Sequence, residues 1–376
     1  MSNIYYPINP DRNAPWNNLP ELPLSPALYQ TVEVYEQLGK AKEALGKLYG
    51  RSIAIPDQSV LINSISLQEA KASSEIENIF TTDDELYKAF SEQHDEPSEG
   101  AVKEVLRYRE ALWRGYEYLN QNAEFDLAYF IEMCHVVKQT NEGFRPHFAQ
   151  TYIRQGGSGP NAGTPIYTPP RGKGIIEEKL QNLLAFMNND EQYPLDPLLK
   201  MAIGHFQFEA IHPFRDGNGR TGRIFNIHFL NKKGLLDYPI LFLSRYIIQH
   251  KNEYYSALAR VSQQGDWQNW ILYMLKAVEM TSYLTFEKIN RIVAAKEDIQ
   301  QVVEAETDIR RPDQLLNLIF SQPYTKVKHL TDEKLYAENT ARNYLNVLSD
   351  LGVLEKKSIQ GHHYYINLEL NSILAD

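Results

Sequence analysis

The chain has 376 residues, of which 43% are hydrophobic, and its 48 acidic and 38 basic residues give a formal net charge of −10 at pH 7. This length supplies ample material for a hydrophobic core and predicts more than one structural unit. The negative charge argues against general affinity for nucleic acids or for an anionic membrane surface. No apolar run is long enough to cross a bilayer, and residues 1–16 lack the pattern of a signal peptide. We therefore expect a cytoplasmic protein without membrane insertion.

The first third of the chain has mainly helical periodicity. Residues 9–26 are rich in proline and asparagine, which predicts an extended arm packed on the surface. Apolar spacing, with breaks at Gly50 and Pro56, then predicts the following helices: residues 27–48, 60–77, 83–90, 99–120 and 127–138. The single cysteine, Cys134, has no partner for an internal disulfide, and its apolar neighbours favour a buried small side chain.

The pattern changes to extended segments after Gly143. Residues 151–154 and 166–170 flank a loop rich in Gly, Pro, Ser and Asn at 155–165, which predicts a β-hairpin. From these residues alone, the segment can be explained as an ordinary surface hairpin. Helical periodicity then resumes in these segments: residues 174–187, 195–211, 221–232, 251–263 and 266–291. A charged helical stretch that continues toward Pro312 predicts a linker to a separate unit.

The last unit, residues 313–376, has the element order of a winged helix. The pattern predicts a helix, a short segment ending in Leu330, a second helix at 339–351 that stops at Gly352, and two extended pieces at 353–357 and 362–367. From Arg311 onward, seven basic residues face eight acidic ones, a net charge of −1. A DNA reader normally needs surplus positive charge for phosphate contacts. For this unit we therefore favour protein interaction or dimer contact over DNA binding.

One run of twelve residues, from His212 to Arg223, carries the residue types that handle phosphates. Gly217 and Gly219 can take positive φ, so that consecutive backbone N–H groups point into one concavity and bind an anion. The helix that follows would add the dipole of its N-terminus to this cradle. Arg220 and Arg223 are three residues apart, which places both guanidinium groups on one face of the first turn, within reach of the same polyphosphate.

Two further residues of the run complete a site for transfer chemistry. Asp216 is a natural ligand for a magnesium ion that bridges phosphates. His212 has an ordinary pKa of about 6.5 and is the group most able to take a proton from a hydroxyl near neutral pH. Each has a structural alternative: His212 as a satisfied core histidine, and Asp216 as a turn residue or helix N-cap. Phe214 is a core residue in either interpretation. The joint pattern indicates a site for a nucleotide's phosphates.

These twelve residues resemble the signature of the Fic family, His-x-Phe-x-(Asp/Glu)-Gly-Asn-Gly-Arg-x-x-Arg, and every specified position matches. The resemblance implies a mainly α fold: a Fic-type helical core with a β-hairpin flap, joined here to the small C-terminal winged-helix (α+β) unit. It implies AMP transfer from ATP to a Ser, Thr or Tyr hydroxyl of a target protein. Doc-type relatives, which transfer phosphate, have a changed loop in place of Gly-Asn-Gly, and phosphocholine-transferring relatives bind another nucleotide. The intact loop favours AMP transfer and leaves both alternatives open.

The resemblance also assigns roles to individual residues. His212 would be the general base, Asp216 the magnesium ligand, and Arg223 the residue that holds the γ-phosphate. The implied ATP-binding set is Gly217, Asn218, Gly219, Arg220, Thr221, Gly222 and Arg223. Tyr254 and Tyr255 stand where family members line the adenine pocket, although core packing is an equally good interpretation of either ring. The hairpin stands where the family has a flap that pairs with the target's backbone and presents its hydroxyl.

A second match lies upstream, where Ser73, Glu77 and Asn78 fit the family's inhibitory pattern (Ser/Thr)-x-x-x-Glu-(Gly/Asn). On a helix Ser73 and Glu77 share a face, and the resemblance makes Arg223 their partner. An Arg223 held by Glu77 cannot also hold a γ-phosphate, so the α-phosphorus of ATP would be poorly aligned for attack. Taken alone, a glutamate in a polar helical stretch is usually a solvated surface charge. Its occurrence together with the complete signature makes the inhibitory interpretation the stronger one.

The whole chain is therefore expected to be an autoinhibited, ATP- and magnesium-dependent protein adenylyltransferase. We expect an N-terminal arm and inhibitory helical region at 1–110, a catalytic core at 111–290, a helical linker at 291–312 and the winged-helix-like unit at 313–376. The partner would be a protein that presents a hydroxyl residue, the chain itself included, and a homodimer is compatible with the pattern. Two alternatives stay open: a DNA-binding regulator with a nucleotide-sensing core, and an enzyme that removes AMP by the same site, with Glu77 orienting a water molecule.

Overall fold

The computed structural model describes residues 8–9, 11–55, 58–92, 100–154, 163–359 and 361–375. The fold is mainly helical, with small antiparallel sheets, as predicted. The N-terminal helices are α1 (Val32–Ile53), α2 (Ser59–Ile76), α3 (Asp83–Ser91), α4 (Gly100–Gln121) and α5 (Leu127–Lys138). The central helices are α6 (Ile175–Asn188), α7 (Pro197–Ile211), α8 (Asn218–Lys232), α9 (Leu243–Gln249), α10 (Lys251–Gln264) and α11 (Trp267–Glu306).

Helices α7 and α8 form the centre of the core. Helix α7 is apolar on nearly every face, which is the pattern of a helix that packs on all sides. Helix α8 is also buried along most of its length, although several of its buried residues are polar. Phe208 of α7 and Phe225 of α8 both pack against Phe130 of α5. The connection between α7 and α8 carries the signature, so this core fixes the position of the site.

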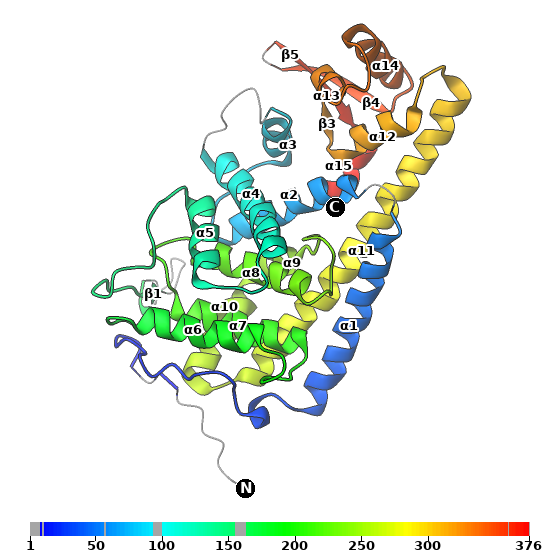
Figure 1. The fold of residues 1–376 in the computed structure, drawn as a ribbon. Helices are drawn as coiled ribbons and strands as arrows, with labels where there is room; N and C mark the ends of the chain where they lie inside the picture. Colours follow the sequence, from blue (N-terminus) through cyan, green and yellow to red (C-terminus); the bar gives the residue numbers. More distant parts are fainter. Residues whose placement is uncertain are drawn as a thin grey trace.

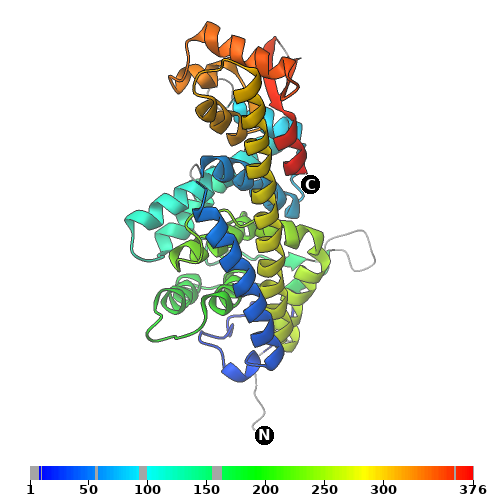
Figure 2. The same cartoon turned by 90° about the vertical axis from the view of Figure 1, so that its right-hand side faces the viewer.

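The long helix α11 spans most of the molecule (Figures 1 and 2). Helix α1 runs beside it, and the C-terminal unit lies at its far end. The sequence predicted a helix to Arg291 followed by a charged helical linker, and the structure has one uninterrupted helix to Glu306. The predicted start of the first helix at residue 27 is wrong, because a 3₁₀ turn ends at Leu28 and the Thr31 side chain caps α1 at Val32.

The predicted arm and hairpin lie together on one side of the core. In the arm Trp16 is buried with its ring edge-on to Tyr167, and its backbone N–H donates to Thr168 O at 3.0 Å. The hairpin strands are β1 (Ile153–Arg154) and β2 (Pro165–Tyr167), which pair antiparallel and confirm the predicted hairpin. Residues 155–162 of the predicted loop lie outside the described residues.

The C-terminal unit contains a three-stranded antiparallel sheet in the order β3-β5-β4. Its elements are α12 (Pro312–Ser321), β3 (Tyr324–Thr325), α13 (Val327–Asp332), α14 (Glu338–Asp350), β4 (Leu354–Ile359), β5 (His362–Asn367) and α15 (Leu368–Ala375). The order of its helices and of the β4–β5 hairpin agrees with the pattern, while β3 and α15 were not predicted. This unit also contacts α3: Lys326 Nζ lies 3.4 Å from Glu92 Oε1, and His329 Nε2 lies 2.9 Å from Ser91 O. The winged-helix assignment stays a prediction.

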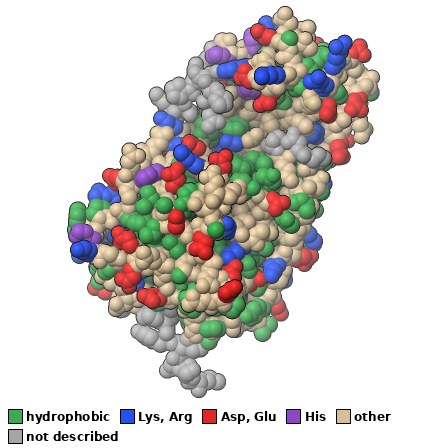
Figure 3. All heavy atoms as spheres, viewed as in Figure 1, with side chains coloured by type: hydrophobic (Ala, Val, Ile, Leu, Met, Phe, Trp, Pro, Cys, Tyr) green, Lys and Arg blue, Asp and Glu red, His purple; other side chains and the backbone are tan. Residues whose placement is uncertain are grey.

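On the face shown in Figure 3, acidic and basic side chains are interspersed over the C-terminal unit at the top of the view. None of the helices described here combines the length and the apolar character required to traverse a lipid bilayer.

Candidate functional site

The connection between α7 and α8 is a tight loop held by its own side chains. His212 ends α7 in the left-handed conformation with φ 50°, and Gly217 precedes α8 with φ 83°. The buried Asn218 side chain spans the loop, since its Oδ1 accepts from Phe214 N at 2.8 Å and its Nδ2 donates to Phe214 O at 2.9 Å. Phe214 is buried, as predicted. Asn218 therefore shapes the loop, and its predicted contact with phosphate stays a prediction.

The imidazole of His212 is held in its neutral form. Burial lowers its pKa, the nearby guanidinium of Arg145 lowers it further, and a hydrogen bond with the Glu209 backbone and the charges of Glu77 and Asp216 oppose this, so that the pKa lies at about 4. A neutral imidazole can accept a proton, which an imidazolium cannot. The environment of His212 is thus suited to a general base at neutral pH.

The sequence predicted an anion cradle at the N-terminus of α8, and the Glu77 carboxylate lies beside this helix end. Gly217 has positive φ, whereas Gly219 lies inside α8 without it, so the positive φ expected at 219 is wrong. Oε1 of Glu77 lies 2.3 Å from the position that a Cβ atom on residue 219 would take, so only a glycine at 219 leaves room for this contact. A carboxylate is stabilised at a helix N-terminus for the same reason as a phosphate: N–H groups and the positive end of the dipole face it. Glu77 therefore occupies space next to the cradle that a phosphate group would need.

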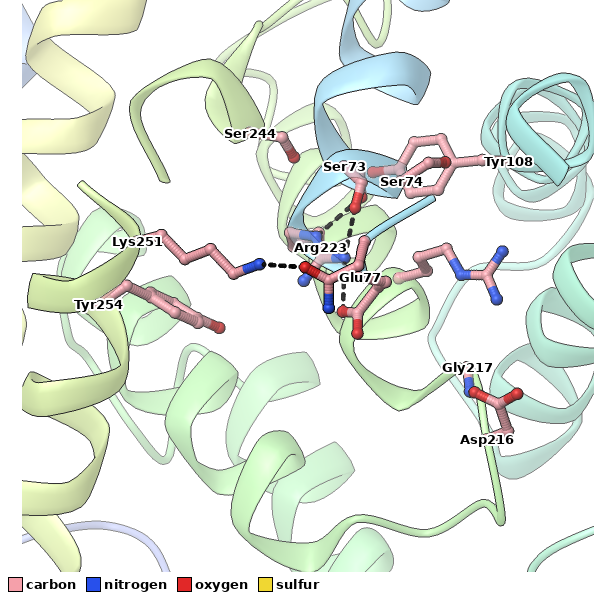
Figure 4. Close-up of polar contacts among 12 residues, drawn as sticks. Ser73, Ser74, Glu77, Tyr108, Asp216, Gly217, Arg223, Ser244, Lys251 and Tyr254 are labelled. Atoms are coloured by element: carbon pink, nitrogen blue, oxygen red, sulfur yellow. Dashed lines mark hydrogen bonds and ion pairs between the residues drawn. The ribbon is translucent and has the colours of Figure 1, made fainter. Parts of the chain in front are cut away.

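Arg223 joins α8 to the end of α2 (Figure 4). Its Nη2 donates to Glu77 Oε1 at 2.9 Å and to Ser73 O at 2.9 Å, and its Nε donates to Ser73 Oγ at 2.7 Å. Arg223 is 1% exposed, whereas the Glu77 side chain is 36% exposed. The structure thus brings together the three residues that the inhibitory pattern and the signature predicted as partners, although 146 positions separate Glu77 from Arg223.

The local sequence explains why Glu77 stands at the end of a helix. Glu77 is the C-cap of α2, and Asn78 follows with φ 63°. Asparagine and glycine are the residues that tolerate this left-handed conformation, which matches the (Gly/Asn) position of the inhibitory pattern. Lys251 Nζ of α10 donates to Asn78 Oδ1 at 3.2 Å and holds the turn from the other side.

A buried glutamate that the sequence did not single out anchors α2 two turns before Glu77. Glu69 accepts from Tyr108 Oη of α4 at 3.0 Å and from the backbone N–H of Ser244 in α9 at 2.8 Å. Burial raises the pKa of Glu69 to about 7, although these donors and Arg223 favour its charged form. In the sequence, the feature that could have identified Glu69 was a charged residue within the apolar spacing of a predicted helix. Its contacts fix α2 between α4 and α9 and so fix the position of the inhibitory residues.

Ion pairs from α4 and α5 engage the other signature residues. Arg220 Nη1 lies 2.9 Å from Glu104 Oε2, and Lys138 Nζ lies 2.7 Å from Asp216 Oδ2. Partial burial acts to raise the pKa of Asp216, but Lys138 outweighs it, so the pKa is lowered. Asp216 has a 68% exposed side chain whose oxygen already contacts a cation. Such a donor fits Mg²⁺, which proteins usually hold through one or two carboxylates together with substrate phosphates.

The remaining predicted residues separate into buried and open positions. Tyr254 is buried, its Oη lies 2.8 Å from His205 Nε2, and its ring packs near Trp270, which is the core interpretation. Tyr255 is 41% exposed. Burial raises its pKa to about 12, Glu77 adds to the rise and Arg223 opposes it, so this ring lies near both residues and remains the candidate for a nucleotide contact. Thr221 is buried inside α8.

The close approach of two helices accounts for Gly222. A Cβ atom at this position would lie 2.5 Å from Oε1 of Glu209 on α7. Burial raises the pKa of Glu209 to about 7, Arg223 opposes that rise, and Glu77 adds to it. Gly222 therefore serves the packing of α8 on α7 beside Arg223, and its predicted part in ATP binding stays a prediction.

The chain is similar to three family descriptions along its length. Residues 35–117 match "Fic/DOC family N-terminal", residues 135–230 match "Fic/DOC family", and residues 295–370 match "Protein adenylyltransferase SoFic-like, C-terminal domain". Together these ranges cover more than half of the chain. They include both the inhibitory segment and most of the signature-bearing core.

Named relatives match over a shorter region. Protein adenylyltransferase fic-1 of Caenorhabditis elegans is 29% identical over 113 residues, which is 30% of this chain and 21% of the relative. Protein adenylyltransferase Fic of Drosophila yakuba is 30% identical over 112 residues, again 30% of this chain and 21% of the relative. The chain thus spans about a fifth of the length of these curated relatives.

Solved structures extend the similarity of the fold. A Fic family protein from Desulfovibrio desulfuricans G20 superposes with a TM-score of 0.54 at 19% identity, covering 89% of this chain and 96% of that one. Fic-1 from Caenorhabditis elegans superposes with a TM-score of 0.51 at 18% identity, covering 68% of this chain and 73% of that one. These superpositions show a shared fold. With the complete signature and the three matching regions, they establish that the chain belongs to the Fic family.

Proposed function

We propose that this protein is an adenylyltransferase that transfers AMP from ATP to a Ser, Thr or Tyr hydroxyl of a protein target. The observation that carries the proposal is the geometry of residues 212–223: a neutral histidine, an exposed carboxylate and an anion cradle meet at one loop. The names of the relatives and of the matched C-terminal region support the same activity. The target protein and a cytoplasmic location stay predictions.

In the proposed reaction the target hydroxyl attacks the α-phosphorus of ATP. His212 takes the hydroxyl proton, an O–P bond forms to the target, and the bond between the α-phosphorus and the bridging oxygen breaks, so that pyrophosphate leaves. Arg220 and Arg223 would hold phosphate oxygens, and the N–H groups at the start of α8 would face the developing charge. Asp216 would hold Mg²⁺, whose charge would neutralise the phosphates. The hairpin would align the target strand beside His212.

We further propose that the conformation described here is an inhibited one. Glu77 contacts Arg223 and fills the space beside Gly219, so the γ-phosphate would lack its arginine and part of its room. The α-phosphorus would then bind out of line with the attacking hydroxyl, and alignment of the reacting atoms is a large part of the catalysis of such transfers. Removal of Glu77 would restore both the arginine and the space.

The test compares the parent protein with Glu77→Gly and a matched control, Glu75→Gln, in Mg²⁺ and ATP labelled at the α- or the γ-phosphate. Glu75 lies in the last turn of α2 and pairs with Lys71, but it does not contact Arg223. We expect protein-bound α-label, with Glu77→Gly at least ~10-fold above the parent and Glu75→Gln equal to it, because Arg223 and the cradle become free.

Other outcomes would replace the proposal. Transfer of γ-label would indicate a kinase-like reaction. Absence of label from Glu77→Gly would contradict AMP transfer and would favour a regulator or an enzyme that removes AMP. Equal α-labelling by the parent and Glu77→Gly would overturn the inhibitory role of Glu77 and leave the activity intact.

A further inference from the structure

The C-terminal end of α7, where His212 stands, has a partner for each of its last carbonyl groups. A helix end normally leaves its final carbonyls without partners inside the helix. Apart from His212 N, which belongs to the helix end itself, the donors here come from separate parts of the chain. The bonds are His212 N to Phe208 O at 2.9 Å, Tyr167 Oη to Ala210 O at 2.8 Å, and Arg145 Nη2 to Ile211 O at 3.2 Å, Nε to His212 O at 2.8 Å and N to Pro213 O at 2.8 Å.

Arg145 supplies most of these donors. Its side chain is 3% exposed, and the same Nη2 group also donates to Pro170 O, just after strand β2. Tyr167 belongs to β2 itself. The end of α7 is therefore joined to the hairpin segment by two side chains, and the guanidinium of Arg145 bridges the two directly.

The conformation of His212 requires such support. A non-glycine residue in the left-handed region costs about 1–2 kcal/mol relative to the right-handed helix, and His212 has φ 50°. Without external donors, α7 could continue or unwind at this point and redirect the imidazole. A displacement of about 1 Å at a reacting group can lower a rate by roughly 100-fold.

We propose that Arg145 is a positioning residue for the transfer reaction: it holds the backbone of His212 in the left-handed conformation and fixes that backbone to the hairpin segment. The inference rests on the proposed AMP transfer, because it assigns His212 as the base and the hairpin as the strand that presents the target. Arg145 does not touch the reacting atoms. It sets the distance between the base and the target hydroxyl.

The charge of Arg145 has a second, separable effect. The groups that face His212 are Arg145 from the loop after α5, Glu77 from the end of α2, Asp216 from the signature loop and the backbone of Glu209. Arg145 is the cation among them and disfavours imidazolium. Loss of the Arg145 charge should therefore raise the pKa of His212. Replacement of the guanidinium by another cation should leave this pKa unchanged.

The experiment uses the full chain with Glu77→Gly as the active background and adds Arg145→Met or Arg145→Lys. The matched control is Lys288→Met, which removes another buried cation that donates to helix-end carbonyls, those of Ile373 and Leu374, far from the site in sequence. The readouts are the rate of α-label transfer, the KM for ATP, and the titration of His212 by NMR, with the buried His205 and His228 as internal references.

We expect Arg145→Met to lower kcat roughly 100-fold with KM for ATP within about twofold, and to move the His212 titration to higher pH. Arg145→Lys should keep the His212 titration but still lower kcat, because one ammonium cannot reach three carbonyls. Lys288→Met should leave kcat and the His212 titration unchanged. Melting curves and ATP binding report on folding in every variant.

Two results would overturn the proposal: a folded Arg145→Met variant that transfers label at the background rate, or an unchanged His212 titration with kcat and ATP affinity lost together. The second pattern would make Arg145 a general structural residue. If the Glu77→Gly background itself transfers no label, the proposed function fails. The NMR titration would still test the contact between Arg145 and His212, so the two failures are distinguishable.

Discussion

The two halves of the site differ in how firmly the fold holds them. The signature loop lies between two buried helices, and its histidine, asparagine and arginines have buried backbones or side chains with several protein partners. The inhibitory half is a helix end whose glutamate is 36% exposed and makes one ion pair. In the proposed function, the catalytic half would thus be a permanent part of the core, and the Glu77 side chain would be the part that leaves Arg223.

The cost of removing each member of the Glu77–Arg223 pair also differs. Arg223 keeps two hydrogen bonds to Ser73 when Glu77 is removed, so its charge is not left without partners. Removal of Arg223, in contrast, would leave a buried cavity and remove a partner of the Ser73 hydroxyl. Glu77 is the more exposed member of the pair, and its departure leaves a smaller desolvation cost than the departure of the buried Arg223 would. The exposed partner of such a pair is therefore the better element for a switch.

The largest effect should come from the permanent half. In the Glu77→Gly background, His212→Ala should lower α-label transfer by about 1,000-fold, within the range that a general base contributes. ATP binding should be retained, because the arginines and the α8 cradle are unchanged. Rates of label transfer and ATP titrations provide the check. Retention of more than a tenth of the rate would remove His212 from the role of base.

The turn after Glu77 offers a test of the inhibitory half alone. Asparagine tolerates the left-handed φ of 63° better than alanine, for which this conformation costs about 1–2 kcal/mol. In Asn78→Ala the end of α2 should therefore loosen, and basal transfer should rise roughly tenfold. Asn78→Gly loses the same contact with Lys251 but tolerates this φ, and it should stay inhibited. A lower melting temperature for Asn78→Ala without any rise in transfer would separate helix stability from inhibition.

A smaller effect is expected at Ser73. Ser73→Ala removes the hydroxyl that accepts from Arg223 Nε, and a hydrogen bond of this kind contributes about 1 kcal/mol, equivalent to roughly a fivefold rise in basal transfer. Ser74→Ala is the matched control, since its hydroxyl donates to Ala70 O within the same helix. Equal rates for the two variants would show that the Ser73 hydroxyl does not help to retain Arg223.

The sequence predicted most of the helices, and the two matching patterns contain residues, Glu77 and Arg223, that the structure brings into contact. Helix α5 was predicted with its observed bounds, because Asp126 caps it and its apolar pattern is strong. Helix α9 and strand β3 were missed, since segments this short have no clear periodicity and are fixed by their neighbours. Helix α15 was missed although Asn367, the last residue of β5, accepts from Leu370 N at its start, because the helix is short and follows the strand directly.

The residues missed at the site have a common cause. Arg145 and Glu69 bind backbone groups or distant side chains that only the tertiary fold brings near, so no local spacing identifies them. Asn218 shows the reverse case: its type suggested a ligand contact, while its side chain spans the loop from Phe214. Local patterns therefore predicted which residues meet at the site more reliably than what each side chain contacts.

The smallest expected effect is the pH dependence of transfer, which again tests the signature loop separately from Glu77. The folded-state pKa of His212 lies at about 4, below the ordinary value of 6.5, so the imidazole stays neutral and able to accept a proton as the pH falls from 7.5 to 5.5. Transfer by Glu77→Gly should therefore change by less than about twofold over this range, whereas a free imidazole would lose roughly tenfold of its neutral form. Rates measured at saturating ATP and Mg²⁺ test this. A steep loss near pH 6.5 would mean that the departure of Glu77 opens His212 to solvent, so that the catalytic half would depend on the inhibitory half for its burial.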